Sequence, residues 1–333
     1  MAKIAFFEVR PWEEEYLSGK LKGHTLQFFS EPVSGKNLEK AEDSEIIAAF
    51  ISSKVTPEVL KALPDLKLVS TMSTGFDHID LSACSARGIK VCNVPCYGEN
   101  TVAEHTFALI LSLSRNVHKS YVRTLKDDFS IDGLVGFDLK GKTIGIIGGG
   151  HIGLHVARMA RAFGMHVRVY DVNRNEFLAE VINFKYSPLG ELLAESDIVS
   201  LHVPYNKNTH HLINRENIAK MKKGAVLINT ARGAVVDTDA LYEALKSGKI
   251  SGAGLDVIEG EDLIKEEHAL LHESGNPGKW REIVRDQKIF RMDNVVFTPH
   301  NAFNSREALI RILDTTVENI EGFLKGGKAN FVG

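Results

Sequence analysis

The sequence predicts an α/β protein of two domains, each built on a parallel sheet covered by helices. Its 333 residues are about twice the common domain length of ~150 residues. Short apolar runs alternate with helix-like stretches along most of the chain, and this alternation is typical of parallel strands joined by helical crossovers. The runs form two series, separated by a turn-rich passage that ends at Gly141. We therefore expect one sheet from each series.

Five apolar runs in the first hundred residues have the length and composition of buried strands. They are Ile4–Val9, Leu26–Phe29, Ile46–Ile51, Leu66–Ser70 and Ile89–Val91. Thr56 followed by Pro57 indicates a helix start, because threonine caps free N–H groups and proline is tolerated in the first turn. Pro64 is expected to end that helix.

A long amphipathic helix is predicted from about Val102 to Leu125, at the junction of the two series. Six strands are then predicted, separated by helical patterns, which indicates a doubly wound sheet. They are Thr143–Ile147, Val167–Tyr170, Ile198–Val203, Ala225–Asn229, Gly254–Val257 and Val295–Thr298. A last amphipathic helix, from about Ser305 to Lys325, has no further strand to follow, so we expect it to return to the first domain.

Composition argues against several classes of partner. The formal net charge is −3 and basic residues are spread along the chain, which disfavours nucleic-acid binding. Apolar stretches such as Phe107 to Leu113 are too short to span a bilayer, so we expect no membrane partner. Cys84, Cys92 and Cys96 lack the spacing of a disulfide framework or a metal site. We expect a reducing cytoplasm, packing roles for Cys92 and Cys96, and no bound metal.

A glycine-rich turn follows the strand Thr143–Ile147 and opens an apolar helix. Its glycines are Gly148, Gly150 and Gly153, in the pattern G-x-G-x-x-G, which lets a pyrophosphate approach the N–H groups of the helix start. The pattern alone is also that of a flexible loop. The next strand, however, ends at Asp171, whose carboxylate can bind both ribose hydroxyls and repels a 2′-phosphate. We predict a Rossmann domain that binds NAD, with Arg174 as a feature that would weaken the preference over NADP.

Three charged residues follow three later strands, at the edge where open parallel sheets bind ligands. Arg232 can hold a carboxylate through two hydrogen bonds, and His300 can donate and retake a proton near neutral pH. Glu261 beside the imidazole would favour its charged form and orient it. Each residue has an ordinary explanation by itself, as a surface ion pair, a loop charge or a helix-start hydrogen bond. Together they predict reduction of a 2-keto acid.

The chain resembles the D-isomer-specific 2-hydroxyacid dehydrogenases nearly from end to end. The stretches that carry the resemblance are Gly75–Asp80, Val102–His105, Gly148–Gly153, Leu201–Pro204, Asn229–Gly233, Gly254–Val257 and Thr298–His300. The resemblance implies a Rossmann NAD domain over residues 101–299 and a smaller, flavodoxin-like substrate domain formed by residues 1–100 and 300–333. It also implies a homodimer, joined through the long helix from Val102.

Roles carry over from the resemblance position by position. It implies that Arg232 binds the substrate carboxylate, that His300 is the acid/base and that Glu261 is its partner. Substrate-loop positions are Ser73, Thr74, Gly75 and Tyr97. Cofactor-lining positions, besides the glycines and Asp171, are His151 and Ile152 at the pyrophosphate, Asp256 near the nicotinamide carboxamide, and Val203, Pro204, Thr209, Thr230 and Ala231.

Within the family the chain is most similar to the D-lactate dehydrogenases. The loop Val257–Glu261 resembles theirs, the segment onward to His300 is long, and Asp262 stands where many relatives have proline. Tyr97 suits a small substrate side chain. Glyoxylate or hydroxypyruvate reductase and phosphoglycerate dehydrogenase remain alternatives, although no cationic cluster in Ser73–Gly75 would hold a phosphate.

Two further hypotheses follow from the sequence. An NAD(H)-sensing binding protein of the corepressor kind is an alternative from another class, and measurable turnover would separate it from an enzyme. His105 and the pair His210–His211 suggest metal ligands at first sight, yet neither has the His-Glu-x-x-His spacing of a zinc helix. We expect them to cap and pack.

Overall fold

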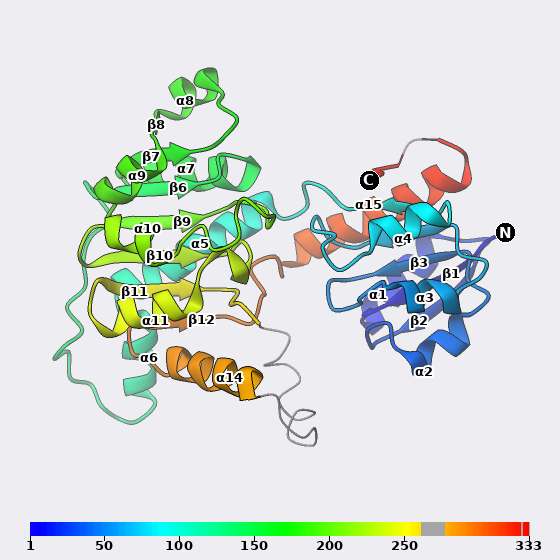
Figure 1. Ribbon diagram of the computed structural model, residues 1–333, viewed down its shortest axis with the longest axis horizontal. Coiled ribbons are helices and arrows are strands. Elements are labelled where there is room, and N and C mark those ends of the chain that lie inside the picture. The colour runs from blue at the N-terminus through cyan, green and yellow to red at the C-terminus, as the bar shows by residue number, and fades with distance from the viewer. Residues whose placement is uncertain (261–276, 328, 333) are drawn as a thin grey trace. The chain divides into compact units, whose positions relative to one another are not determined.

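Figure 1 shows the computed structural model of the chain, which describes residues 1–260, 277–327 and 329–332. The chain forms two compact units, one of residues 1–97 and 305–333 and the other of residues 98–304. Each unit contains one parallel sheet, so the predicted fold class is confirmed. The structural borders lie at 97 and 304, against predicted borders at 100 and 299.

The first unit has five parallel strands in the order β2-β1-β3-β4-β5, the flavodoxin-like arrangement. The strands are β1 Lys3–Phe7, β2 Thr25–Phe29, β3 Ile46–Ala49, β4 Leu68–Thr71 and β5 Lys90–Cys92. The helices are α1 Pro11–Lys20, α2 Gly35–Leu38, the 3₁₀ helix η1 Glu39–Ala41, α3 Pro57–Ala62, α4 Leu81–Ala86 and α15 Arg306–Leu324. All five predicted strands are present. The Thr56 side chain caps α3 by accepting a hydrogen bond from the N–H of Val59, as predicted.

The second unit has seven parallel strands in the order β12-β11-β10-β9-β6-β7-β8, a Rossmann sheet extended by one strand. They are β6 Thr143–Ile147, β7 His166–Tyr170, β8 Lys185–Tyr186, β9 Ile198–Leu201, β10 Ala225–Asn229, β11 Ile250–Leu255 and β12 Val295–Phe297. The prediction of six strands was wrong. The extra strand, β8, has only two residues, too few to produce an apolar run in the sequence.

The helices of the second unit cover both faces of this sheet (Figure 1). They are α5 Glu99–Ser114, α6 Val117–Thr124, α7 His151–Ala162, α8 Glu176–Ile182, α9 Leu189–Glu195, α10 Arg215–Lys220, the 3₁₀ helix η2 Gly233–Val235, α11 Thr238–Lys246 and α14 Pro277–Phe290. The buried strands β9 and β10 lie in the middle of the core, and every one of their residues is buried.

The single long helix predicted from Val102 to Leu125 was also wrong. The chain leaves the helix after Ser114 and passes through Asn116 in the left-handed conformation, with φ of 52°. The N–H of Phe137 donates to the carbonyl of Ser114 at 2.8 Å, and the Asn116 side chain donates to the carbonyl of Leu134 at 3.2 Å. The loop that returns at Phe137 thus pairs the Ser114 carbonyl, which a continuous helix would have paired internally.

The last helix, α15, belongs to the first unit, which is therefore discontinuous in sequence. Ser305 caps α15 by accepting a hydrogen bond from the N–H of Ala308. Tyr16 in α1 donates to Asp314 at 2.8 Å, and Asn319 donates to the carbonyl of Asn93 at 2.8 Å. These contacts join the end of the chain to its beginning.

All three cysteines are free thiols. Cys84 and Cys92 are buried, and burial raises the pKa of the Cys92 thiol to about 12, which makes it unreactive. The packing role predicted for Cys92 agrees with this burial. The same prediction for Cys96 was wrong, because this residue is exposed in a loop with φ of 60°.

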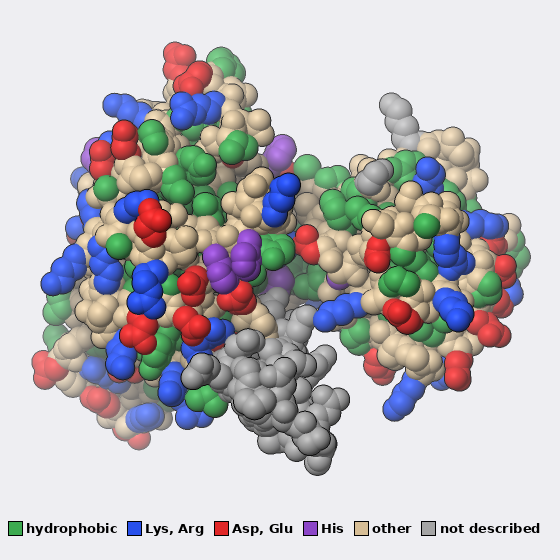
Figure 2. Space-filling view, viewed as in Figure 1, with side chains coloured by type: hydrophobic (Ala, Val, Ile, Leu, Met, Phe, Trp, Pro, Cys, Tyr) green, Lys and Arg blue, Asp and Glu red, His purple; other side chains and the backbone are tan. Residues whose placement is uncertain are grey.

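Acidic and basic side chains are intermingled on the visible face of the molecule (Figure 2). No stripe of one sign of charge runs over the described side chains in that view. Among the residues that the structure describes, no helix is long and apolar enough to cross a membrane.

Candidate active site

Three neighbouring strands of the second unit bring two of the predicted catalytic positions, Arg232 and His300, to one edge of the sheet. Asn229 at the end of β10 pairs with Leu255 of β11, which pairs with Phe297 of β12. Arg232 and His300 each come three residues after these paired positions. Because the strands are parallel and in register, the turns that carry Arg232 and His300 leave the same edge of the sheet.

The backbone at His300 is in the left-handed region, with φ of 53°. This conformation is unusual for a residue with a side chain and persists only where neighbours hold it. The N–H of His300 faces the carbonyls of Asp256 and Thr298, each at 2.9 Å. The imidazole is thus carried on a short, constrained turn directly after β12.

Asp256, at the end of β11, is the anchor of this turn. The residue is 1% exposed, and three groups of the 298–302 segment donate to its carboxylate. The Thr298 hydroxyl donates to Oδ1 at 2.5 Å, the N–H of Asn301 to Oδ1 at 3.0 Å, and the N–H of Ala302 to Oδ2 at 2.9 Å. These hydrogen bonds compensate the burial of the charge and fix the segment that carries His300.

The turn that carries Arg232 is fixed from both ends. The Asn229 side chain accepts a hydrogen bond from the N–H of Ala231 and donates to the carbonyl of Arg232, both at 3.0 Å. Gly233 packs against the segment after β11, since a Cβ at this position would lie 2.1 Å from the backbone carbonyl of Ile258. Only glycine allows this close approach.

Glu261, the predicted partner of His300, lies outside the described residues. Glu259, two residues earlier, forms an ion pair with His211: Oε1 of Glu259 lies 2.8 Å from Nε2 of His211. The rings of His210 and His211 are stacked with centroids 3.9 Å apart. The packing role expected for the histidine pair is observed in this stacking. The sequence did not indicate the ion pair between His211 and Glu259.

The glycine-rich turn has the geometry that a dinucleotide pyrophosphate requires. Gly148 has φ of 102°, and a Cβ there would lie 2.4 Å from the carbonyl oxygen of His202. A Cβ on Gly153 would lie 2.0 Å from the carbonyl of Gly148, so α7 approaches the turn closely. Nothing lies within 4 Å of the Cβ position of Gly150, which leaves the start of α7 open to a ligand. The residues present therefore fit NAD.

The acidic residue after β7 lies beside this turn. Asp171 Oδ2 accepts a hydrogen bond from the N–H of Gly149 at 2.6 Å, and Oδ1 accepts one from Asn173 at 2.7 Å. Arg174 lies over the ring of Tyr186, 5.5 Å from its centroid. Arg174, which the sequence suggested could weaken the preference for NAD, makes a cation–π contact with Tyr186 in this structure.

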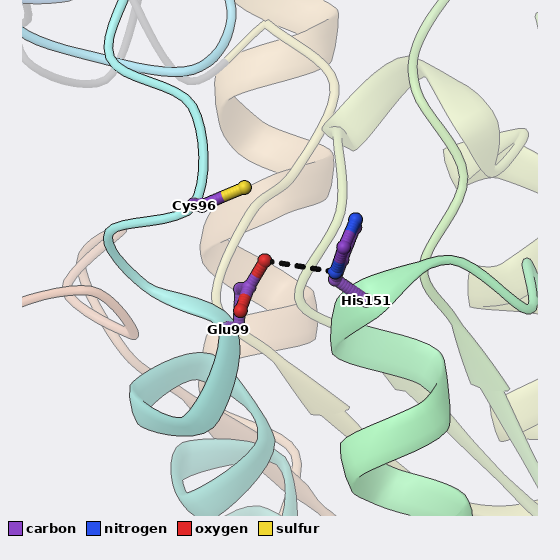
Figure 3. Close-up of side chains that lie close together, drawn as sticks. All are labelled: Cys96, Glu99 and His151. Atoms are coloured by element: carbon purple, nitrogen blue, oxygen red, sulfur yellow. Dashed lines mark ion pairs between the residues drawn. The ribbon is translucent and has the colours of Figure 1, made fainter.

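The first residue of α7 makes an ion pair with the first residue of α5. Figure 3 shows the Glu99 carboxylate pointing to the His151 ring, whose Nδ1 lies 3.0 Å from Oε1 of Glu99. The His151 side chain is 76% exposed.

His202 was not predicted as a site residue, although it lies in the motif Leu201–Pro204 at the end of β9. Its Nε2 is 2.8 Å from the hydroxyl of Ser200. Its Nδ1 is buried and has no hydrogen-bond partner in the described part of the chain. Burial lowers the pKa of His202 to about 3, so the ring is neutral at physiological pH.

The predicted cofactor positions after β9 form one turn. Thr209 donates to the carbonyl of Pro204 at 2.7 Å and accepts a hydrogen bond from the N–H of Asn206 at 2.8 Å. Val203 is half-buried at the start of this turn, which leaves the same edge of the sheet as the glycine-rich turn after β6.

In the first unit, the predicted substrate loop follows β4. Ser73 is buried and donates to the carbonyl of Gly75 at 2.6 Å, while Thr74 donates to the carbonyl of Val94 at 2.8 Å. The carbonyl of Tyr97 accepts a hydrogen bond from Arg311 Nε at 2.8 Å. The turns after β4 and β5 are thus joined, and the four predicted positions belong to two connected loops.

The sequence profile described as the NAD binding domain of D-isomer specific 2-hydroxyacid dehydrogenase matches residues 107–302. The chain belongs to this family. The predicted resemblance is confirmed, and NAD is the cofactor of this dehydrogenase. The match covers the glycine turn and the turns that carry Arg232 and His300.

Curated relatives and solved structures agree with this assignment over nearly the whole chain. The solved D-lactate dehydrogenase of Aquifex aeolicus, complexed with NAD and lactic acid, is 42% identical with a TM-score of 0.88, covering 99% of this chain and 98% of that one. The D-lactate dehydrogenase of Escherichia coli is 34% identical over 97% of both chains. The glyoxylate reductase of Korarchaeum cryptofilum is 38% identical over 87% of this chain and 82% of its own.

Proposed function

We propose that this 2-hydroxyacid dehydrogenase is a D-lactate dehydrogenase, which converts pyruvate, NADH and a proton to D-lactate and NAD, and the reverse. The proposal rests above all on the register of β10, β11 and β12, which sends Arg232 and His300 from the same sheet edge. The similarity to the D-lactate dehydrogenases of Aquifex aeolicus and Escherichia coli supports the choice of substrate.

In the proposed reaction each residue has one task. The Arg232 guanidinium holds the substrate carboxylate with two hydrogen bonds and so orients C2. The bound nicotinamide supplies the hydride. His300 donates a proton to the C2 oxygen of pyruvate and takes it back in the reverse direction. Glu261 would favour the imidazolium form of His300 and hold its ring.

Substrate-loop residues support a small, uncharged substrate side chain. The loop Ser73–Gly75 contains no cation that would hold a phosphate, which argues against phosphoglycerate. Glyoxylate is the second candidate, favoured by the 38% identical glyoxylate reductase. Glyoxylate and pyruvate differ by one methyl group, a difference worth only about 1–3 kcal/mol in a pocket.

The decisive measurement is NADH oxidation with pyruvate, glyoxylate, hydroxypyruvate and bulkier 2-keto acids. Pyruvate should give the highest kcat/KM, and the product should be D-lactate rather than L-lactate. His300→Ala should lower kcat by about 100-fold or more, and Arg232→Gln should mainly raise KM for pyruvate. His166→Asn changes an exposed histidine and serves as the control. Undiminished turnover after His300→Ala would remove the assigned proton donor.

A homodimer is proposed from the surface of α6 and the loop after it. Large apolar side chains there are exposed, from 49% for Val122 to 92% for Val135. The others are Val117, Tyr121, Leu125, Phe129 and Ile131. Several large apolar side chains exposed on one helix and its following loop indicate an interaction site, and a second copy would cover them. Sedimentation should give a dimer, and Tyr121→Glu combined with Leu125→Glu should give monomers.

The proposed compartment is the reducing cytoplasm. Cys84 and Cys92 are buried and unpaired, and no disulfide joins the three thiols. Localisation of the tagged protein would test this.

A further inference from the structure

Two adjacent residues of α5, His105 and Thr106, contact the two turns that carry the candidate catalytic residues. His105 Nε2 lies 3.0 Å from the hydroxyl of Thr298, two residues before His300. Thr106 Oγ1 lies 3.1 Å from the hydroxyl of Thr230, two residues before Arg232. This arrangement differs from the packing role that the sequence suggested for His105.

The direction of the hydrogen bonds at His105 follows from the donors available. The Thr298 hydroxyl has one proton, and it donates that proton to Asp256 Oδ1. Thr298 must therefore accept from His105, whose Nε2 carries the hydrogen. His105 Nε2 also lies 3.5 Å from Asp256 Oδ1. The result is a relay from His105 through Thr298 to the buried carboxylate that holds Asn301 and Ala302.

The same reasoning applies to the second contact. The Thr106 hydroxyl donates to the carbonyl of Val102 at 2.8 Å, within its own helix. It must therefore accept from the Thr230 hydroxyl, since its only proton is already used. Thr106 is fully buried and Thr230 is half-buried, so the Thr106 side of this pair of hydroxyls is shielded from water.

We propose that His105 and Thr106 are positioning residues of the active site. His105 sets the place of the proton donor through Thr298 and Asp256. Thr106 sets the place of the carboxylate-binding arginine through Thr230. Because the two residues are neighbours on one rigid helical turn, α5 fixes the separation between the proton donor and the carboxylate site. This inference rests on the proposed roles of His300 and Arg232.

Four variants test the His105–Thr298 contact and the Thr106–Thr230 contact separately. His105→Leu removes the donor at similar size, and His105→Gln restores an N–H donor near the Nε2 position. Thr106→Val removes the hydroxyl with the shape kept, and Thr106→Ser restores it. Ala108→Ser, on the exposed face of α5, is the matched control. The helix, its length and its packing on the sheet are otherwise unchanged.

The expected kinetics differ between the His105 and the Thr106 variants. His105→Leu should lower kcat by about 10- to 100-fold, because small displacements of a catalytic group have effects of this order. It should also alter the pH profile of kcat/KM, with KM for pyruvate changed less than about threefold. Thr106→Val should raise KM for pyruvate about 5- to 10-fold with a smaller change in kcat. The Gln and Ser variants should recover most of each loss.

Amide hydrogen exchange gives a readout that needs no turnover. His105→Leu should speed exchange in residues 298–302 and leave 229–233 unchanged, and Thr106→Val should do the reverse. If both variants match Ala108→Ser in exchange and kinetics, the positioning role is wrong while the proposed function stands. If exchange changes as expected but wild type reduces no 2-keto acid, the proposed function fails and the structural coupling stands.

Discussion

The two halves of the second sheet hold their loops in different ways. After β10, β11 and β12, buried side chains join the turns, with the Asp256 carboxylate and the Asn229 amide as the central groups. After β6, glycines leave the backbone at the start of α7 open. In the proposed reaction, the turns after β10, β11 and β12 must fix side chains for acid/base chemistry, whereas the start of α7 must present N–H groups to the pyrophosphate. Side-chain hydrogen bonds make the turns after β10, β11 and β12 rigid. The absence of side chains on the glycines gives a ligand access to the start of α7.

The largest effect is expected in the first half, from Asp256→Ala. Loss of the carboxylate leaves Thr298 and the N–H groups of Asn301 and Ala302 without their acceptor. The free energy of unfolding should fall by about 3 kcal/mol or more, and kcat/KM by about 100-fold. Urea unfolding and steady-state kinetics measure both. Asp239→Ala, at an exposed carboxylate, should change stability by less than about 1 kcal/mol.

Gly233→Ala should have the next largest effect. The new Cβ would meet the backbone of Ile258 at 2.1 Å, and backbone cannot move aside cheaply. We expect a loss of about 1–3 kcal/mol in stability and a rise in KM for pyruvate. Gly190→Ala, where nothing lies within 4 Å, should be neutral or stabilising by up to about 1 kcal/mol. Equal melting temperatures for the two variants would contradict the close packing described here.

In the second half, Asp171→Ala should affect the cofactor more than the fold. The dissociation constant for NADH should rise about tenfold, because a charge-assisted contact to the ribose is lost. The discrimination against NADPH should weaken, since the repulsion of the 2′-phosphate disappears. Fluorescence titration with both cofactors measures these changes. Unaltered NADH affinity would show that Asp171 serves only the hydrogen bonds to Gly149 and Asn173.

A further expected effect is a pH dependence of stability from His202. Its folded pKa is lowered from 6.5 to about 3 by burial, so the unfolded chain binds a proton that the folded chain does not. Stability from this group is full above pH 6.5 and decreases as the pH falls towards 3, by at most about 1.4 kcal/mol per pH unit. Comparing wild type with His202→Asn between pH 7 and pH 5 isolates this slope. Parallel pH curves would show that the ring is solvated when folded.

Much of the fold was predictable because strands and helices leave periodic patterns in the sequence. Eleven runs were predicted as strands, and each corresponds to a strand of the structure. The strand β8 was missed because two residues carry no pattern. The break at Asn116 was missed because apolar residues continue at helical spacing on both sides, while the partner that ends the helix, Phe137, lies far along the chain.

The sequence by itself determined the strands and their order along the chain, the glycine turn and the acidic residue Asp171 that follows the next strand. It also determined that Arg232 and His300 follow β10 and β12. Periodicity and residue type carry this information, because they reflect local geometry and chemistry. Only the tertiary structure decided which groups support the site. His105 and Thr298 are 193 residues apart, and no pattern in the sequence around either residue predicts their contact. Their contact exists because α5 packs beside β11 and β12, and the topology of the sheet, not a motif, selects such partners.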